Sequence, residues 1–270
     1  MDYLENLLSL IMEIMNLHIR RNGKMNKRLK RFRHSAYIKL YGEALSVQRA
    51  KWTERVVGQI PKGSRILDAG AGECKNKKYC GHLTYVSQDF CEYSPADKAM
   101  HCSSDADEWD YSKIDIVSDI TEIPVEDSSF DAIICTEVFE HIMNPELAVK
   151  EFSRIINRGG VLITTTPGIC GNHMAPYIFW HGISEYWYKE IYKKYGFEIK
   201  EMKRCGNYFD YMTEQMIQSR YQAQFYGKKI NLFDSFILFC SSLVMRKYSK
   251  KTHGSETFVT DNIMVVAVKE

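Results

Sequence analysis

Features that would mark a membrane or a secreted protein are missing from this chain of 270 residues. No segment reaches the roughly eighteen uninterrupted apolar residues that a membrane-spanning helix needs, and residues 230–245, which come nearest, are interrupted by Asn231 and Asp234. The eight cysteines include no C-x-x-C pair, and several lie in apolar runs, where a thiol behaves as a small buried hydrophobe. We therefore expect reduced cysteines and a cytoplasmic location. The composition, with 45% hydrophobic and 26% charged residues, excludes intrinsic disorder, collagen and a disulfide scaffold.

The chain also lacks a strong net charge. It carries 36 Lys and Arg against 34 Asp and Glu, a formal net charge of +2, which is far from the field of a dedicated nucleic-acid coat. The charge is unevenly placed, because residues 20–33 hold eight basic residues and no acid. A basic arm is thus attached to a mildly acidic body, and we expect no stable nucleic-acid partner.

An amphipathic helix is predicted immediately before this arm, because apolar residues recur at helical spacing over residues 4–15. Acids precede the apolar stretch and bases follow it, the reverse of a secretory signal peptide. Two interpretations of residues 1–33 stay open. They form either a peripheral anchor on anionic lipid at the inner membrane face or a lid helix with a solvated basic face, and RNA binding is a third alternative.

Short β-rich runs alternate with helical or loop segments from residue 65 to the end of the chain. Seven strands separated by crossover lengths predict an α/β, Rossmann-like, seven-stranded and mostly parallel sheet with helices on both faces. The predicted strands are residues 65–70, 83–90, 115–120, 130–137, 159–167, 196–202 and 258–270.

Four parts are predicted along the chain. Helices are expected over residues 37–60, from Pro145 to a stop at Gly159-Gly160, and over residues 211–226 and 232–248. The last two lie in a connection too long for a simple loop, which favours a helical cap over the cleft. The parts are an N-terminal helical extension with the basic arm (1–60), a Rossmann-like core (61–205), a helical cap insertion (206–256) and the last core strand (257–270).

A glycine turn ends the first predicted strand, with the sequence Asp68-Ala69-Gly70-Ala71-Gly72. Glycines two apart at a strand end let backbone approach a ligand, and ligands of open parallel sheets bind at that edge. The dinucleotide fingerprint G-x-G-x-x-G fails, because Lys75 stands at its last position. Asp89 ends the second strand 21 residues after Asp68, where a carboxylate can accept both hydroxyls of a ribose. Further landmarks follow in order: Asp119-Ile120, Phe130-Asp131, Thr136-Glu137 and Gly159-Gly160.

This series resembles the class I S-adenosylmethionine-dependent methyltransferases, in particular the small-molecule enzymes whose first motif is L-D-x-G-x-G. The resemblance runs from about residue 65 to residue 167. It implies S-adenosylmethionine as the cofactor, with Asp68, Gly70 and Gly72 beside its methionine part. It also implies that Asp89 holds the ribose, that Phe90 flanks the adenine, that Asp119 and Ile120 meet the adenine edge, and that Thr136 and Glu137 line the cleft near the sulfonium. Cys74 stands where many members have a third glycine, so a side chain must fit there.

The first motif and the stretch that leads to Asp89 are similar to methyltransferases of bacterial cell-surface polysaccharide pathways. This resemblance implies O- or N-methylation of a small-molecule acceptor, a sugar or glycolipid, in envelope biosynthesis. Two rival functions stay open. One is an RNA methyltransferase that uses the basic arm, and the other is a non-catalytic, cofactor-binding scaffold subunit.

Histidines near the predicted cleft are the candidate catalytic groups. A general base helps methyl transfer when the acceptor is a hydroxyl, and we expect His141 or His181 to act as this base, with His173 as a further candidate. Glu137, Glu140 and His141 form E-x-x-E-H, which together with His173 or His181 could ligate a divalent metal, as in small-RNA 2′-O-methyltransferases. The same motif also occurs in metal-free members of the superfamily, so we expect no metal. The aromatic residues up to position 181 are expected to face the site and the later ones to pack in the core.

Overall fold

The computed structural model describes residues 44–94 and 109–270. The predicted N-terminal amphipathic helix and the basic arm lie outside the described residues. The chain divides into two compact units. One contains Gln48–Cys205 with Val259–Glu270, and the other contains Gly206–Phe258 with the described N-terminal residues up to Val47.

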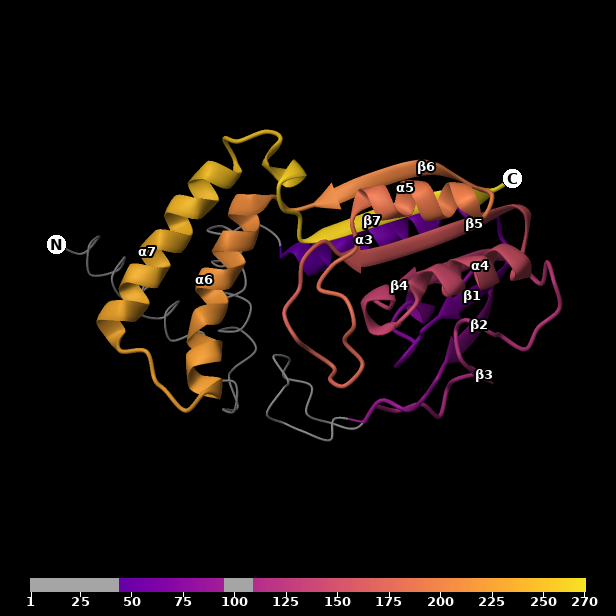
Figure 1. The fold of residues 1–270 in the computed structure, drawn as a ribbon, viewed down its shortest axis with the longest axis horizontal. Helices are drawn as coiled ribbons and strands as arrows, with labels where there is room; N and C mark the ends of the chain where they lie inside the picture. The colour runs from indigo at the N-terminus through magenta and orange to yellow at the C-terminus, as the bar shows by residue number, and fades with distance from the viewer. Residues whose placement is uncertain (1–43, 95–108) are drawn as a thin grey trace. The chain divides into compact units, whose positions relative to one another are not determined.

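The first unit is built on a seven-stranded sheet with the order β3-β2-β1-β4-β5-β7-β6 (Figure 1). The strands from β3 to β5 pair in parallel, whereas β7 runs antiparallel to both β5 and β6. The strands are β1 (Arg65–Ala69), β2 (Thr84–Asp89), β3 (Ile116–Val117), β4 (Phe130–Thr136), β5 (Ile156–Pro167), β6 (Phe197–Cys205) and β7 (Asn262–Lys269). The predicted α/β fold with a mostly parallel sheet is confirmed.

Both faces of this sheet are covered. Ile66 and Leu67 of β1 are fully buried, as are Ile133 and Ile134 of β4. Because successive strand residues point to opposite faces, neighbouring buried residues require packing on each side, which is the pattern of a parallel sheet between helices. The helices of this unit are α3 (Leu45–Val57), which belongs to it from Gln48 onward, α4 (Pro145–Ile155) and α5 (Glu185–Lys194), with short 3₁₀ turns η1 (Lys77–Tyr79) and η3 (Phe139–His141).

The predicted end of helix α4 is wrong. The helix ends at Ile155, and the chain enters β5 at once because Ile156 pairs with Phe130 of β4. Gly159-Gly160 therefore lie inside the strand, where the β4–β5 register shifts between Phe130 and Ala132. Glycine is favoured both after the end of a helix and at an irregular start of a strand, so the sequence alone does not distinguish the two.

The second unit holds the helices α6 (Tyr208–Phe225) and α7 (Leu232–Ser249), followed by η4 (Ser255–Thr257). Asn207 caps α6 in a capping box with Asp210, and Asn231 caps α7. An ion pair between Asp210 and Arg246 joins the two helices. Both helices occur close to the predicted positions, and their placement over the cleft stays a prediction. Among the described residues, no helix combines the length and the apolar character needed to cross a membrane.

Candidate functional site

A pocket of about 340 Å³ lies where β1, β2 and β4 end. This is the edge of a parallel sheet at which ligands bind. Six residues predicted to bind a cofactor line it, namely Gly70, Asp89, Phe90, Asp119, Ile120 and Glu137. The rest of the lining is Gln88, Glu92, Trp109, Val138, His141, Ile142, Met143, Met174, Tyr177 and Phe179.

The glycine turn after β1 has no room for side chains. Gly70 has φ +70°, and a Cβ built there would lie 2.6 Å from Cγ2 of Val138. Gly72 has φ +51°, and its Cβ would lie 2.7 Å from Cζ3 of Trp109. Both positions combine a left-handed backbone with a close neighbour, so each of them requires glycine. The turn can therefore present bare backbone to a ligand.

Asp68 does not line the pocket, and its side chain is bonded by residues of two other segments. Its buried carboxylate accepts hydrogen bonds from Tyr85 Oη at 2.6 Å and from Asn76 Nδ2 at 3.0 Å. Burial raises the pKa of Asp68 to about 6, against the lowering effect of these two donors. Asn76 also donates to Thr136 Oγ1 at 3.0 Å, so one amide joins two of the predicted residues. The sequence analysis did not single out Asn76 or Tyr85.

Asp89 is oriented by the backbone. Its Oδ2 accepts the Gly72 N–H at 2.8 Å and its Oδ1 accepts the Cys91 N–H at 2.9 Å. Hydrogen bonds from two fixed donors hold the carboxylate at the pocket wall, while each oxygen keeps a second lone pair. The side chain can thus accept further hydrogen bonds from hydroxyl groups of a ligand.

Aromatic and apolar groups form the neighbouring wall. Phe90 meets Tyr177 edge-to-face with ring centroids 5.0 Å apart, and Trp109 lies beside Gly72. Ile120 is nearly buried, and the Oδ1 of Asp119 accepts both the N–H and the hydroxyl of Thr121. A flat apolar ring fits such a wall, and Asp119 provides a polar edge to it. No motif marked Trp109 in the sequence.

Glu137 is held by three other segments of the chain. It has φ +56°, and its carboxylate accepts hydrogen bonds from Thr165 Oγ1 at 2.8 Å and Arg49 Nη1 at 2.6 Å. Arg49 also donates to Asn262 Oδ1 at 2.7 Å, and Asn262 donates back to Glu137. Arg49 comes from α3, a segment in which the sequence carries no site signal.

The two histidines predicted as general base differ in location. His141 lines the pocket, with its Nδ1 2.7 Å from the carbonyl oxygen of Tyr177. Burial lowers the pKa of His141 to about 4, so its imidazole is neutral near pH 7. His181 is exposed, lies outside the pocket lining and has its Nδ1 3.1 Å from the Cys170 carbonyl oxygen. The role predicted for each stays a prediction, and the geometry brings only His141 to the pocket.

The aromatic stretch after β5 divides much as predicted. Tyr177 and Phe179 line the pocket, whereas Tyr188 and Tyr192 are fully buried in the core. Trp180 and Tyr186 depart from the expectation. Trp180 is exposed and its Nε1 donates to the Ile142 carbonyl oxygen at 3.0 Å, and Tyr186, expected to pack in the core, is 70% exposed.

Comparisons with known proteins agree with this arrangement. Residues 67–164 match the family model described as a methyltransferase domain. Two curated relatives are ubiquinone biosynthesis O-methyltransferases. The protein from Dechloromonas aromatica is 25% identical over 44% of this chain and 50% of its own length. The protein from Maricaulis maris is 30% identical over 40% of this chain and 43% of its own length. The matched region thus spans half or less of each relative.

Solved structures share the fold at low identity. The [4+2]-cyclase SpnF has a TM-score of 0.51 at 16% identity, covering 82% of this chain and 81% of that one. A candidate sarcosine dimethylglycine methyltransferase from Galdieria sulphuraria has a TM-score of 0.52 at 16% identity, covering 88% of this chain and 96% of that one. Phosphoethanolamine N-methyltransferase 2 from Haemonchus contortus has a TM-score of 0.50 at 18% identity, covering 87% and 56%.

The order of motifs, the sheet topology and the matched domain agree. The turn after β1, Asp89 at the end of β2 and Asp119 after β3 fall inside the matched residues, at the sheet edge that carries the pocket. Residues 67–164 therefore form a methyltransferase domain, and the chain is similar in fold and motif order to the class I S-adenosylmethionine-dependent methyltransferases.

Proposed function

We propose that this chain transfers a methyl group from S-adenosylmethionine to an oxygen of a small molecule. The observation that carries the proposal is the pocket, whose lining includes Gly70, Asp89 and Asp119 together with His141. A fold alone does not determine a reaction, and the [4+2]-cyclase with the same fold makes that plain. The proposal therefore rests on the residues of the site.

The residues on the β1–β2 side fit the predicted cofactor. In the proposal, the bare turn at Gly70 and Gly72 approaches the methionine part, and the oriented Asp89 carboxylate accepts the ribose hydroxyls. Phe90 and Ile120 hold the adenine ring, and Asp119 meets its polar edge. Asp68 and Thr136 act by holding Asn76 and the turn, because neither lines the pocket.

Positioning supplies most of the catalysis in an in-line displacement. Bound S-adenosylmethionine supplies an electrophilic methyl carbon, so that the acceptor oxygen forms the new C–O bond while the C–S bond breaks and its electron pair stays on sulfur. His141 is the candidate base for the hydroxyl proton, since its imidazole is neutral and lines the pocket. The side chains of Met174, Tyr177 and Phe179 line the pocket together with it.

The acceptor class is the finer part of the proposal. A sugar or glycolipid of envelope biosynthesis fits the aromatic lining, because sugar rings stack on aromatic faces through their C–H groups. An aromatic hydroxyl compound is the second candidate. It is favoured by the names of the two curated relatives, both O-methyltransferases of ubiquinone biosynthesis.

Calorimetric titration with S-adenosylmethionine and S-adenosylhomocysteine tests the donor half. We expect micromolar binding, weakened about 100-fold in Asp89→Ala, because each hydrogen bond to a charged acceptor contributes about 1.5–3 kcal/mol. The matched control is Asp110→Ala, which removes an exposed carboxylate outside the pocket lining and should bind like wild type. A folded protein that binds neither compound would contradict the proposal and favour a scaffold role.

Mass spectrometry of reaction mixtures tests the acceptor half. Nucleotide sugars, glycolipids and dihydroxybenzene compounds are each incubated with protein and S-adenosylmethionine, and a gain of one methyl group is sought. RNA serves as the comparison substrate. Methylation of RNA in preference to every small molecule would contradict the proposed acceptor class.

We also propose peripheral membrane contact by residues 1–33. The support is the sequence pattern of a basic arm beside an apolar helical face. Deletion of these residues should abolish sedimentation with anionic liposomes, and unchanged sedimentation would remove this part of the proposal.

A further inference from the structure

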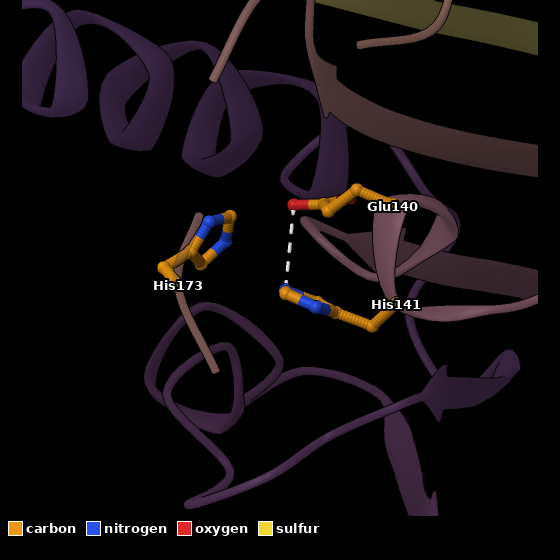
Figure 2. Close-up of side chains that lie close together, drawn as sticks. All are labelled: Glu140, His141 and His173. Carbon is orange, nitrogen blue, oxygen red and sulfur yellow. Dashed lines mark ion pairs between the residues drawn. The ribbon is translucent and has the colours of Figure 1, made fainter. Parts of the chain in front are cut away.

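Three side chains from two segments meet beside the pocket. Glu140 and His141 belong to η3 after β4, and His173 comes from the segment between β5 and α5 (Figure 2). One potential ligand atom from each residue lies within 4.8 Å of the other two. The Glu140 Oε1 is 3.7 Å from the His141 Nε2, a distance too long for a hydrogen bond.

Glu140 is a buried carboxyl group without a visible partner. Its exposed fraction is 1%, and neither of its oxygens accepts a hydrogen bond from any other described residue. Carboxyl groups in protein interiors are paired, protonated or bound to a metal, because an isolated buried charge is very costly. Arg49, a nearby cation, is already engaged by Glu137 and Asn262. A proton on Glu140 would in turn need an acceptor within hydrogen-bonding distance.

Both imidazoles are oriented in the same way. The Nδ1 of His141 lies 2.7 Å from the Tyr177 carbonyl oxygen, and the Nδ1 of His173 lies 2.9 Å from the Gly171 carbonyl oxygen. A carbonyl oxygen can only accept, so each Nδ1 carries the hydrogen and each Nε2 keeps a lone pair. Metal-binding histidines have this arrangement, in which a backbone carbonyl fixes the tautomer of the ligating ring.

Two imidazole lone pairs and a carboxylate facing one another repel unless a cation lies between them. Glu140 is buried and His141 is half-buried, so both groups have lost much of their contact with water. A bound cation would offset these desolvation costs directly.

We propose that Glu140, His141 and His173 bind a divalent transition-metal ion of the zinc or manganese type. Two imidazoles with one carboxylate suit these ions better than magnesium, which prefers oxygen ligands. Ligand atoms bound at about 2.1 Å from an ion lie closer together than 4.8 Å, so binding requires an inward shift of His173, which is half-buried on a loop. This assignment departs from the expectation of a metal-free site.

The ligand set differs from the one that the motif suggests. Glu137 is the first acid of E-x-x-E-H, but Thr165, Arg49 and Asn262 already occupy its carboxylate. His181 is exposed and lies outside the cluster. The structure thus selects Glu140 over Glu137 and His173 over His181.

The location gives the cation a role in the proposed reaction. His141 lines the pocket, so the positions left open by three protein ligands can receive an acceptor hydroxyl. Coordination lowers the pKa of a hydroxyl, so its proton is lost more readily. The metal would then replace His141 as the group that activates the acceptor. This consequence rests on the proposed function, whereas metal binding does not.

Calorimetry on the full chain, freed of metal by dialysis against chelator, tests the site with Zn²⁺, Mn²⁺ and Mg²⁺. We expect one Zn²⁺ or Mn²⁺ per chain, bound more tightly than Mg²⁺, and visible absorption bands of Co²⁺ typical of imidazole ligands. Glu140→Gln and His173→Ala should each weaken binding by at least about 100-fold. The controls His253→Ala and Glu126→Gln, both at exposed positions, should bind like wild type. Thermal melts confirm that each variant is folded.

Absence of stoichiometric binding by the folded chain would overturn the proposal, and so would unchanged binding in Glu140→Gln and His173→Ala. Measurement of the turnover of the variants distinguishes activation of the acceptor by a metal ion from activation by His141 alone. If the metal activates the acceptor, Glu140→Gln and His173→Ala lose turnover together with metal. If His141 acts alone as base, both variants keep wild-type turnover, and the catalytic consequence is wrong. Metal binding in a chain that methylates no acceptor would support this site and contradict the proposed function.

Discussion

Asp68, near the end of β1, and Glu140, in η3 after the neighbouring strand β4, are both acids about 1% exposed, and burial raises the pKa of each. They differ in what the chain provides for them. Tyr85 and Asn76 donate to Asp68, whereas no other described residue donates to Glu140. An acid that the protein surrounds with its own donors supports the fold. An acid left without donors, beside two imidazoles, has the surroundings of a ligand site.

The same contrast separates the two sides of the pocket. On the β1–β2 side, the backbone N–H groups of Gly72 and Cys91 hold Asp89, and the Gly70 N–H donates to the side-chain oxygen of Gln88. On the β4 side, the lining comes from side chains such as Met174 and Tyr177, and the polar groups lie in a loop. A backbone-built wall suits a cofactor common to a whole superfamily, and a wall built from side chains can change with the acceptor.

Replacement of Gly70 by alanine should have the largest effect on the backbone-built side. The new Cβ would meet Val138 at 2.6 Å, and alanine disfavours the φ of +70°. Backbone strain and overpacking together should cost about 4 kcal/mol of unfolding free energy or an equivalent loss of cofactor affinity. Urea unfolding and calorimetry measure both. Gly81→Ala is the matched control, because no atom lies within 4 Å of its Cβ position, and an equal loss there would refute the argument.

Asp68 should make the stability of the fold depend on pH. Its pKa is about 6 in the folded state against 3.8 for the free side chain, so the folded chain binds the extra proton between these values. The free energy of unfolding should therefore fall by about 3 kcal/mol as pH rises from about 3 to 7. Asp68→Asn should remove this slope. Unfolding by urea across that pH range checks it, and Asp131→Asn, at an exposed position, should keep the wild-type slope.

The sequence predicts the β1–β2 side of the pocket better than the β4 side. Asp68, Gly70 and Asp89 come from consecutive parallel strands, whose carboxyl ends meet at one edge, so their motifs already imply proximity. The strand pattern likewise predicts the sheet, because alternating β-rich runs and crossovers permit few topologies. Gly159-Gly160 led to a wrong prediction of the end of helix α4, because glycine occurs at irregular positions of strands as well as at helix ends.

The β4 side could not be predicted in this way. His173 and His181 are the same residue type in one loop, and only the path of the backbone brings His173 next to His141. Arg49 reaches Glu137 from a helix 88 residues earlier, a contact that has no periodic signal. Trp109 follows no motif at all. Such contacts are set by tertiary packing of loops and helix ends, which local sequence patterns do not encode.

A substitution of Arg49 tests how much its ion pair with Glu137 stabilises the β4 side of the pocket. Arg49→Met keeps most of the side-chain volume but leaves Glu137 with hydrogen bonds only from neutral groups, Thr165 and Asn262. We expect a loss of about 2 kcal/mol in unfolding free energy, since a half-buried charged hydrogen bond is lost. Chemical denaturation measures it. Arg55→Met, which removes an exposed ion pair with Glu201, should cost less than half as much, and equal losses would count against a special role of Arg49.

Substitution of Cys74 should change the stability least among these variants, and it tests the last part of the turn after β1. It stands where the family often has a third glycine, and its φ is +57°, so the backbone keeps the glycine-like conformation while the thiol is buried. Cys74→Gly should relieve strain by slightly more than the flexibility and burial it gives up, for a net gain of about 1 kcal/mol. Cys80→Gly is the matched control, because Cys80 is equally buried at φ −98° and should lose stability instead. Differential scanning calorimetry of the two variants reads the sign directly. If both variants lose stability, packing of the Cys74 thiol stabilises the fold by more than the left-handed backbone destabilises it. Side-chain packing would then determine the stability of this end of the turn.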